Sequence, residues 1–183
     1  LPFCKPAYGI QKRVQNLGEI LAGDSIENSP YRIQALVNAT CVWLCAMEVS
    51  RQAMSHLREM IQNEYMVNWM IDGLPAVTPL VAFGSHETVL EMDGFPVGIA
   101  AHGNFYLHNH VVFNISFHQQ SEEYSGIRVV GFEVTPMSLN TDLNEGLRSK
   151  QHLVCNAAAG KGYFSVGEDK AKTVLYTYDV HWS

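Results

Sequence analysis

The chain of 183 residues is poor in charge, and its few basic side chains are scattered. Lys, Arg, Asp and Glu together make up 16% of the residues, and the formal net charge is −6 at pH 7. No run of Lys or Arg provides the basic surface that nucleic-acid binding requires. An acidic chain is also disfavoured on anionic lipid head groups. We therefore expect neither nucleic acid nor an anionic membrane surface as a partner.

Long apolar runs are missing as well. A membrane-spanning helix needs roughly 20 mostly apolar residues. The longest candidate, residues 66–83, is interrupted by Asn68, Asp72, Gly73, Pro75 and Pro79. The 47% of hydrophobic residues are nevertheless enough for the core of a single domain over residues 1–183. Because the first residue is Leu1 and not Met, we expect a processed or trimmed start.

The most informative stretch runs from Phe105 to His118 and alternates at period two. One face carries Phe105, Leu107, Asn109, Val111, Phe113, Ile115 and Phe117. The other carries Tyr106, His108, His110, Val112, Asn114, Ser116 and His118. This pattern predicts one long, half-buried β-strand.

Other segments predict further strands and one main helix. Strands are expected at residues 31–40, at 127–134 up to Pro136, and at 173–182. A helix is expected at about residues 50–65, with Ser50 as its N-cap and an apolar stripe at helical spacing. Residues 138–162 are expected to form a polar excursion. The sequence thus predicts a mainly β (α+β) fold, a β-sandwich of antiparallel strands with one inserted helix and long loops.

Two features indicate an oxidising compartment. Asn38-Ala39-Thr40 and Asn114-Ile115-Ser116 are acceptor signals for N-linked glycans, and both asparagines fall on polar faces of predicted strands. The chain also has four cysteines, which allow three pairings that these residues alone do not rank. Together these features favour a lumenal or extracellular domain with glycans on Asn38 and Asn114. The alternative is a cytosolic protein whose cysteines are buried free thiols.

His108 and His110 are the candidate titrating or metal-binding residues. On a continuous strand, side chains two residues apart point the same way, so the two imidazoles could share a metal ion. A metal needs three or four converging ligands, and no acid follows between Val111 and Gln119. We therefore favour surface imidazoles, or imidazoles bonded to a loop, over a metal site. A second hypothesis is pH sensing by His108 and His110 in an acidifying compartment.

Several segments in order carry a family resemblance. They include Asn16 to Leu21, Ile71 to Pro75, Phe105 to His110, Gly131 to Pro136, and Tyr176 to Trp182, with the cysteines at Cys4, Cys41 and Cys45. In this combination the chain resembles the lumenal domain of the transmembrane nine superfamily, the nonaspanins. The residues from Tyr106 to His110 and from Val180 to Trp182 are most similar to the member-four branch.

The resemblance implies a location and a role. Members have a cleaved signal peptide, a large lumenal domain and nine membrane spans, and they reside in Golgi and endosomal membranes. They are implicated in sorting membrane proteins and in adhesion, and no enzymatic activity is associated with the lumenal domain. We therefore expect a non-enzymatic ectodomain that ends at Ser183 without its transmembrane portion. Its expected partners are that portion, membrane-protein cargo and its own N-linked glycans, and no cofactor is expected.

The resemblance also implies the disulfides. Shorter members keep only the counterparts of Cys4 and Cys45, which implies the pairs Cys4–Cys45 and Cys41–Cys155. Each would close a long loop, and the chain-entropy model then predicts a stabilisation of the fold by each bond.

Two rival functions remain from the sequence. The first is a stand-alone secreted module that binds a carbohydrate or a protein. The second is a metal-dependent enzyme centred on His108 and His110. Separately, the sequence shows no convincing set of nucleophile, base and acid.

Overall fold

The computed structural model describes residues 2–13, 17–23, 25–80, 90–119, 126–140, 155, 162–167 and 171–183. The predicted excursion at residues 138–162 lies mostly outside these ranges. Within the described part of the chain, no helix is both long and apolar enough to cross a membrane.

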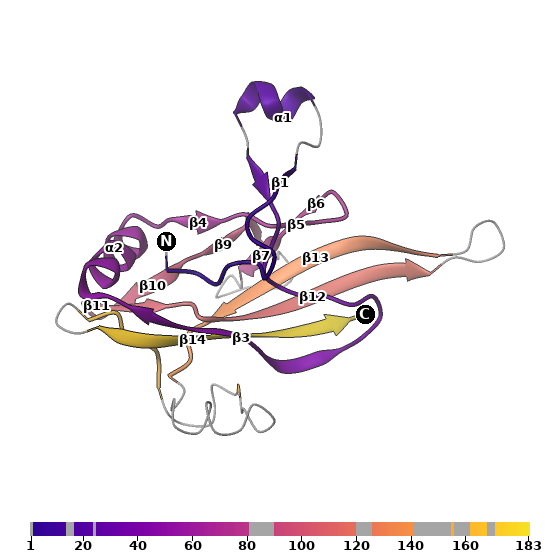
Figure 1. Ribbon diagram of the computed structural model, residues 1–183. Coiled ribbons are helices and arrows are strands. Elements are labelled where there is room, and N and C mark those ends of the chain that lie inside the picture. The colour runs from indigo at the N-terminus through magenta and orange to yellow at the C-terminus, as the bar shows by residue number, and fades with distance from the viewer. Residues whose placement is uncertain are drawn as a thin grey trace.

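A six-stranded sheet forms the centre of the molecule (Figure 1). Its strands, in spatial order, are β3 (Ala39–Val49), β14 (Lys172–Trp182), β12 (His110–Gln119), β13 (Ile127–Met137), β7 (Val77–Leu80) and β8 (Leu90–Asp93). The mainly β, α+β class predicted from the sequence is confirmed. The sheet is mixed, however, because β12 runs parallel to β14 and β13 runs parallel to β7, while the other three pairings are antiparallel.

The predicted long strand is divided into two strands that belong to different sheets. β11 (Asn104–Leu107) pairs with β10 (Gly98–Ala101), and β12 begins at His110 between β13 and β14. The change of partners occurs at residues 108–109, where the side chain of Asn109 adds hydrogen bonds to both neighbouring segments. Its Nδ2 donates to the carbonyl oxygens of Leu139 and Leu175, both at 2.9 Å, and its Oδ1 accepts from the Leu139 amide at 2.8 Å. The alternation continues through this break, so the sequence pattern does not reveal it.

The main helix is confirmed as α2 (Arg51–Gln62). Ser50 is its N-cap, as predicted, and the Ser50 side chain accepts a hydrogen bond from the Ala53 amide at 3.2 Å. The buried face of the helix joins one hydrophobic cluster with β14 and β11, made of residues that include Met54, Leu57, Ile61, Leu107, Val174 and Tyr176. At Gly98 the helix comes so close that an added Cβ would lie 2.7 Å from Ile61 Cδ1. The helix therefore packs directly on β10 because that position is glycine.

A second hydrophobic cluster covers the inner face of the sheet and is rich in aromatic rings. Phe113, in the middle of β12, is completely buried. The ring of Phe113 lies 5.3 Å from Tyr31, 5.4 Å from Trp69 and 5.8 Å from Phe132, centroid to centroid. These separations are typical of favourable aromatic contacts.

Two boundaries predicted from the sequence are wrong. Residues 31–38 form no strand, and β3 begins only at Ala39. A turn intervenes, with the Val37 amide donating to the Gln34 carbonyl oxygen and Leu36 at a positive φ of 60°, while Tyr31 packs into the second cluster. β13 also continues through Pro136 to Met137. β13 pairs with β7 only at Glu133, so β7 does not need the backbone N–H that Pro136 lacks.

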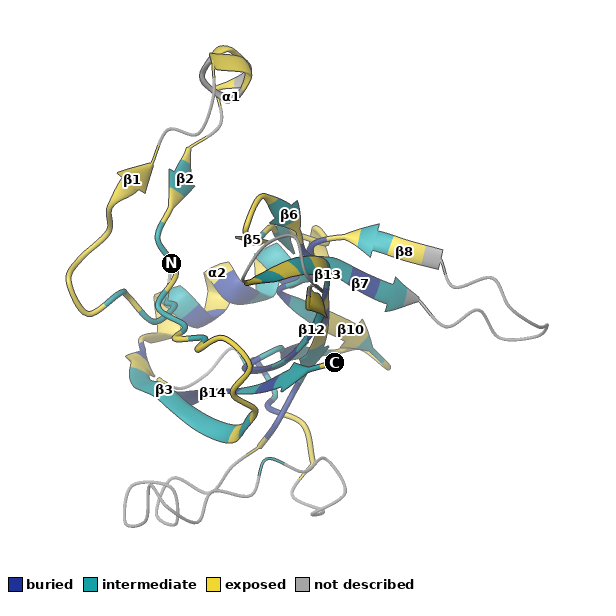
Figure 2. Cartoon of the chain, turned by 90° about the vertical axis from the view of Figure 1, so that its right-hand side faces the viewer, coloured by how far each residue is buried: buried dark blue, intermediate teal, exposed yellow. Residues whose placement is uncertain are grey.

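The remaining elements are short. An arm made of β1 (Lys12–Arg13), α1 (Leu17–Ala22) and β2 (Ile26–Glu27) projects away from the sheet and is largely exposed (Figure 2). Two small ladders, β4 (Met66–Val67) with β9 (Phe95–Pro96) and β5 (Met70–Ile71) with β6 (Leu74–Pro75), contribute to the same side as α2. The helix and these ladders thus form the layer that covers the inner face of the sheet.

Candidate functional site

Two disulfides connect distant parts of the chain. Cys4 is joined to Cys45, and Cys41 is joined to Cys155, so all four cysteines are oxidised. These are the two pairs that the family resemblance implies. The first bond ties the N-terminal segment to β3, where Cys4 and Cys45 pack against the first hydrophobic cluster. The second bond ties the start of β3 to Cys155.

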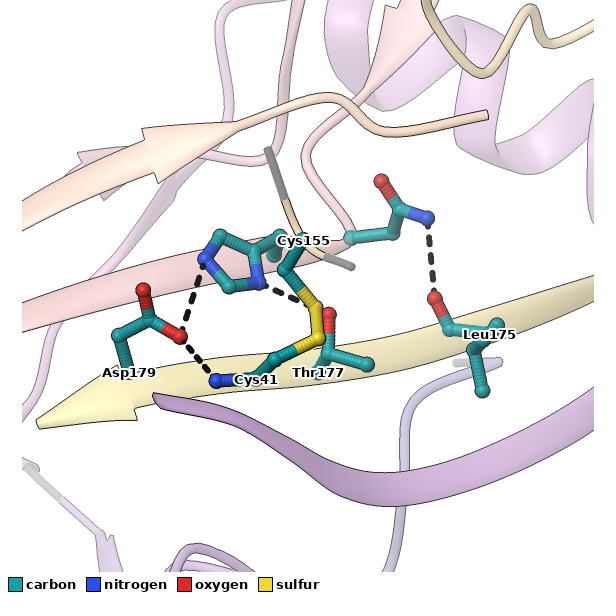
Figure 3. Close-up of a disulfide and its surroundings, with 7 residues drawn as sticks. Cys41, Cys155, Leu175, Thr177 and Asp179 are labelled. Carbon is teal, nitrogen blue, oxygen red and sulfur yellow. Dashed lines mark hydrogen bonds and ion pairs between the residues drawn. A yellow bond between two sulfur atoms is a disulfide. The ribbon is translucent and has the colours of Figure 1, made fainter. Parts of the chain in front are cut away.

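A polar cluster lies beside the second disulfide and centres on Asp179 of β14 (Figure 3). The Asp179 Oδ1 accepts a hydrogen bond from the Cys41 amide at 2.5 Å. Cys41 has a positive φ of 51°, an unusual conformation for a residue with a side chain. The same Asp179 oxygen lies 3.7 Å from Nε2 of His110. The carboxylate therefore links the half-cystine backbone to a histidine.

His110 is completely buried, so the prediction of a surface imidazole is wrong for this residue. Its Nδ1 forms a hydrogen bond of 2.8 Å with the Thr177 hydroxyl, and its Nε2 has no hydrogen-bond partner among the described residues. Burial lowers the pKa of His110 because the charged ring loses water, while the Asp179 carboxylate opposes this and raises it. The net direction is downward. His110 is thus a neutral buried ring at neutral pH, facing a carboxylate that would stabilise its charged form.

The His108 side chain contacts a different part of the molecule. Its Nδ1 lies 2.8 Å from the carbonyl oxygen of Pro96 in β9, and its ring lines a cavity beside α2. Burial lowers the pKa of His108, and the hydrogen bond to Pro96 opposes this shift. A carbonyl oxygen only accepts, so Nδ1 carries the proton of the neutral ring. This is the imidazole bonded to a neighbouring segment that the sequence predicts as the simpler interpretation.

The two histidines do not converge on a shared centre. They belong to one predicted strand, but the break at residues 108–109 sends His108 to Pro96 and His110 to Thr177. Over the described ranges, no group of three or more His, Cys, Asp or Glu side chains is placed to hold a metal ion. The hypothesis that His108 and His110 jointly bind a metal therefore gains no geometric support.

The first predicted glycan acceptor, Asn38, is exposed and lies directly before β3, not on the predicted strand. Its Oδ1 accepts a hydrogen bond of 2.8 Å from the Trp182 amide. A glycan attaches to the other side-chain atom, Nδ2. The geometry around Asn38 is therefore compatible with an attached sugar.

The second predicted acceptor, Asn114, lies on a strand, as expected, and this strand is β12. It is half-buried and alternates with the buried residues Phe113 and Ile115, so it belongs to the face of the sheet opposite the aromatic cluster. Its neighbours across the sheet are Glu133 and His181. The surroundings of Asn114 are polar, which suits a solvated glycan.

Asp179, Thr177 and the structural role of Asn109 were not predicted from the sequence. Asp179 is the one carboxylate in β14 and stands between Tyr178 and Val180, and that exception is a signal that could have identified it. The buried Thr177 and Asn109 gave no comparable signal, because their partners are distant in the chain.

Comparisons with known proteins agree on one family. The family model "Endomembrane protein 70" matches residues 1–183. A transmembrane 9 superfamily protein of Schizosaccharomyces pombe is 36% identical over 98% of this chain and 27% of its own length. Transmembrane 9 superfamily member 11 of Arabidopsis thaliana is 31% identical, covering 98% of this chain and 31% of the relative. Human transmembrane 9 superfamily member 4 is 28% identical over 100% of this chain and 30% of its own length.

No solved structure matches this chain. The chain spans about three tenths of the length of these curated relatives. Because the family model covers every residue and the matches to relatives extend over nearly the whole chain, the chain belongs to the transmembrane 9 superfamily, the Endomembrane protein 70 family.

Proposed function

We propose that residues 1–183 are the lumenal domain of a nine-span membrane protein of the Golgi and endosomes. The observation that carries this proposal is the family match over the whole chain. Two disulfides support it, because such bonds persist in oxidising compartments and are rare in the cytosol. The transmembrane part would lie outside this sequence, in the portion of the relatives that the chain does not cover.

The proposed role of the domain is recognition or support in the sorting of membrane proteins and in adhesion, without catalysis. The names of the matched relatives state no catalytic activity. The domain would act on membrane-protein cargo together with its own transmembrane portion. Glycans on Asn38 and Asn114 would cover the surface around the start of β3 and the outer face of β12.

Acidification would regulate the domain through His108 and His110. Each ring is held neutral by burial at neutral pH and makes one hydrogen bond through Nδ1. Protonation places a charge on a buried ring, which is costly, although His110 gains an ionic contact with Asp179. The compartments of the secretory and endosomal pathway span the pH range in which histidine titrates. A decrease in pH would therefore loosen the contacts between these histidines and β9 or β14.

The lumenal assignment is tested by expression of residues 1–183 behind a cleavable signal sequence in mammalian cells. Peptide N-glycosidase should reduce the mass by two glycans. Asn38→Gln and Asn114→Gln should each remove one glycan, and the double variant should be insensitive to the enzyme. The same chain expressed without the signal sequence is the control. A secreted chain that carries no glycan would contradict the proposed glycan sites.

The sorting role requires the full-length protein. Its loss should shift multi-span membrane proteins between the Golgi and the cell surface, measured by surface biotinylation with and without re-expression. An unchanged surface proteome would contradict a sorting function. One specific observation favours ligand binding as a second candidate function, namely a cavity beside α2.

A further inference from the structure

A cavity of about 700 Å³ lies between α2, the N-terminal segment and the inner face of the sheet. Its walls are mainly apolar and aromatic, and include Phe3, Tyr31, Trp69, Phe95, Val111 and Tyr176. Sites for small organic ligands typically have volumes of about 300–1,000 Å³ and walls of this kind. The size and lining of the cavity are therefore those of a binding site for a small molecule.

The cavity is held open by connections that do not depend on a ligand. The Cys4–Cys45 disulfide fixes the N-terminal segment on one side. The Tyr176 hydroxyl donates to the Pro2 carbonyl oxygen at 2.9 Å, which holds the same segment next to β14. On another side, Met54, Leu57 and Ile61 attach α2 to the first hydrophobic cluster. Walls fixed in this way are preorganised, which reduces the entropy lost on binding.

One polar atom within the cavity lining has unused hydrogen-bonding capacity. His108 lines the cavity, and its Nδ1 is occupied as a donor to Pro96. In the neutral ring Nε2 is then an acceptor, and none of the described residues donates to it. His108 as a whole is half-buried, whereas His110 is completely buried. Burial lowers the pKa of His108, which keeps Nε2 an acceptor at neutral pH.

The charges around the cavity select against anions. The exposed polar lining residues are His56, Glu59 and Asn63, all on α2 or at its C-cap, and none of the described lining residues is Lys or Arg. A carboxylate or phosphate head would face Glu59 and a chain of net charge −6. A neutral head group that donates one hydrogen bond avoids this repulsion and suits the Nε2 acceptor of His108.

We propose that this cavity binds a neutral amphiphile, a molecule with a ring or hydrocarbon body and a single hydroxyl group that donates to His108 Nε2. The apolar body lies against the aromatic walls, and the hydroxyl is the specifying contact. A sterol and a long-chain alcohol both have this chemistry. The inference concerns the domain itself and does not depend on the proposed compartment or sorting role.

The test uses purified residues 1–183 with both disulfides intact, at pH 7.5. The first probe is the fluorescent sterol dehydroergosterol, followed by energy transfer from tryptophan, since Trp69 lines the cavity. The second is 1-tetradecanol, measured as a competitor and by calorimetry. Saturable one-to-one binding of either probe supports the proposal, and the probe that binds more tightly identifies the body as rigid rings or a flexible chain. Tetradecanoate is the matched anion and should bind at least 10-fold more weakly than 1-tetradecanol.

Two variants locate the bound probe. His108→Asn can keep a donor toward Pro96 but loses the Nε2 acceptor, and should weaken binding about 3- to 10-fold, the range of one net hydrogen bond. Met60→Trp, a lining position on α2, should fill part of the cavity and weaken binding at least 10-fold. His102→Asn, in an exposed turn at positive φ, is the control and should leave binding unchanged.

Three results would overturn the proposal. They are no saturable binding of either probe to the folded wild-type domain, binding that both cavity variants leave unchanged, and tetradecanoate binding as tightly as 1-tetradecanol. None of these results bears on the glycan or sorting experiments, so the two proposals fail separately.

Discussion

Removal of each disulfide should destabilise the domain by a different and predictable amount. Cys4–Cys45 spans a sequence separation of 41 residues, and Cys41–Cys155 spans 114. In the chain-entropy model these separations correspond to about 4 and about 5 kcal/mol at 25 °C. Domains are stable by only about 5–15 kcal/mol, so the loss of either bond removes a large share of the stability.

The assay is urea unfolding of three non-reduced proteins at pH 7.4. These are the wild type, the double variant Cys4→Ala with Cys45→Ala, and the double variant Cys41→Ala with Cys155→Ala. The free energy of unfolding should fall in both variants, by ~1 kcal/mol more in the second if chain entropy dominates. The slope against urea should rise in both, because an unfolded chain without the cross-link exposes more surface.

The packing of Cys4 and Cys45 reduces the expected difference between the two variants. Cys4 and Cys45 lie against the first hydrophobic cluster, so alanine there also loses apolar contact. If the Cys4/Cys45 variant loses as much free energy of unfolding as the Cys41/Cys155 variant, the lost apolar contact equals the difference in chain entropy. Losses below ~1 kcal/mol in both variants, with unchanged slopes, would refute the reasoning that the disulfides act by restricting the unfolded chain.

Two further predictions concern the core and pH. Phe113→Ala should lower the free energy of unfolding by about 3–5 kcal/mol in urea unfolding, because the ring is completely buried among aromatic neighbours; Val130→Ala, at a side chain 60% exposed, should change it little. Folding lowers the pKa of His110 from 6.5, so the unfolded chain takes up a proton more readily than the folded one, and the free energy of unfolding falls below about pH 6.5. His110→Asn removes this titrating group and should therefore reduce the loss of stability between pH 7.5 and 5. The exposed His118 on the same strand provides the control His118→Asn, and identical pH profiles for wild type and His110→Asn would contradict this account.

Much of the sheet was predictable because its strands alternate strongly. The last strand, expected at residues 173–182, is β14 at Lys172–Trp182. The helix was predictable for a similar reason, since an apolar stripe and an N-cap serine both act within one turn of the chain. Local patterns of this kind determine which residues form an element and which of its faces is apolar.

The candidate site was predictable only in part. The alternation placed His108 and His110 on one face, but it contains no information on pairing partners, and these change at Asn109. The burial of His110 depends on Thr177, Asp179 and the Cys41–Cys155 bond, which are distant from it in sequence. The direction of its pKa shift follows from that burial and was therefore not accessible from the sequence.

The sequence by itself determined the family, the mainly β class, the helix and the acceptor signals for glycans, because each depends on the identity or spacing of nearby residues. Only the tertiary structure decided the mixed order of the sheet, the separation of the two histidines and the cavity beside α2. These features arise where segments far apart in the chain meet, and the physical reason is that pairing, burial and empty volume are properties of several elements together.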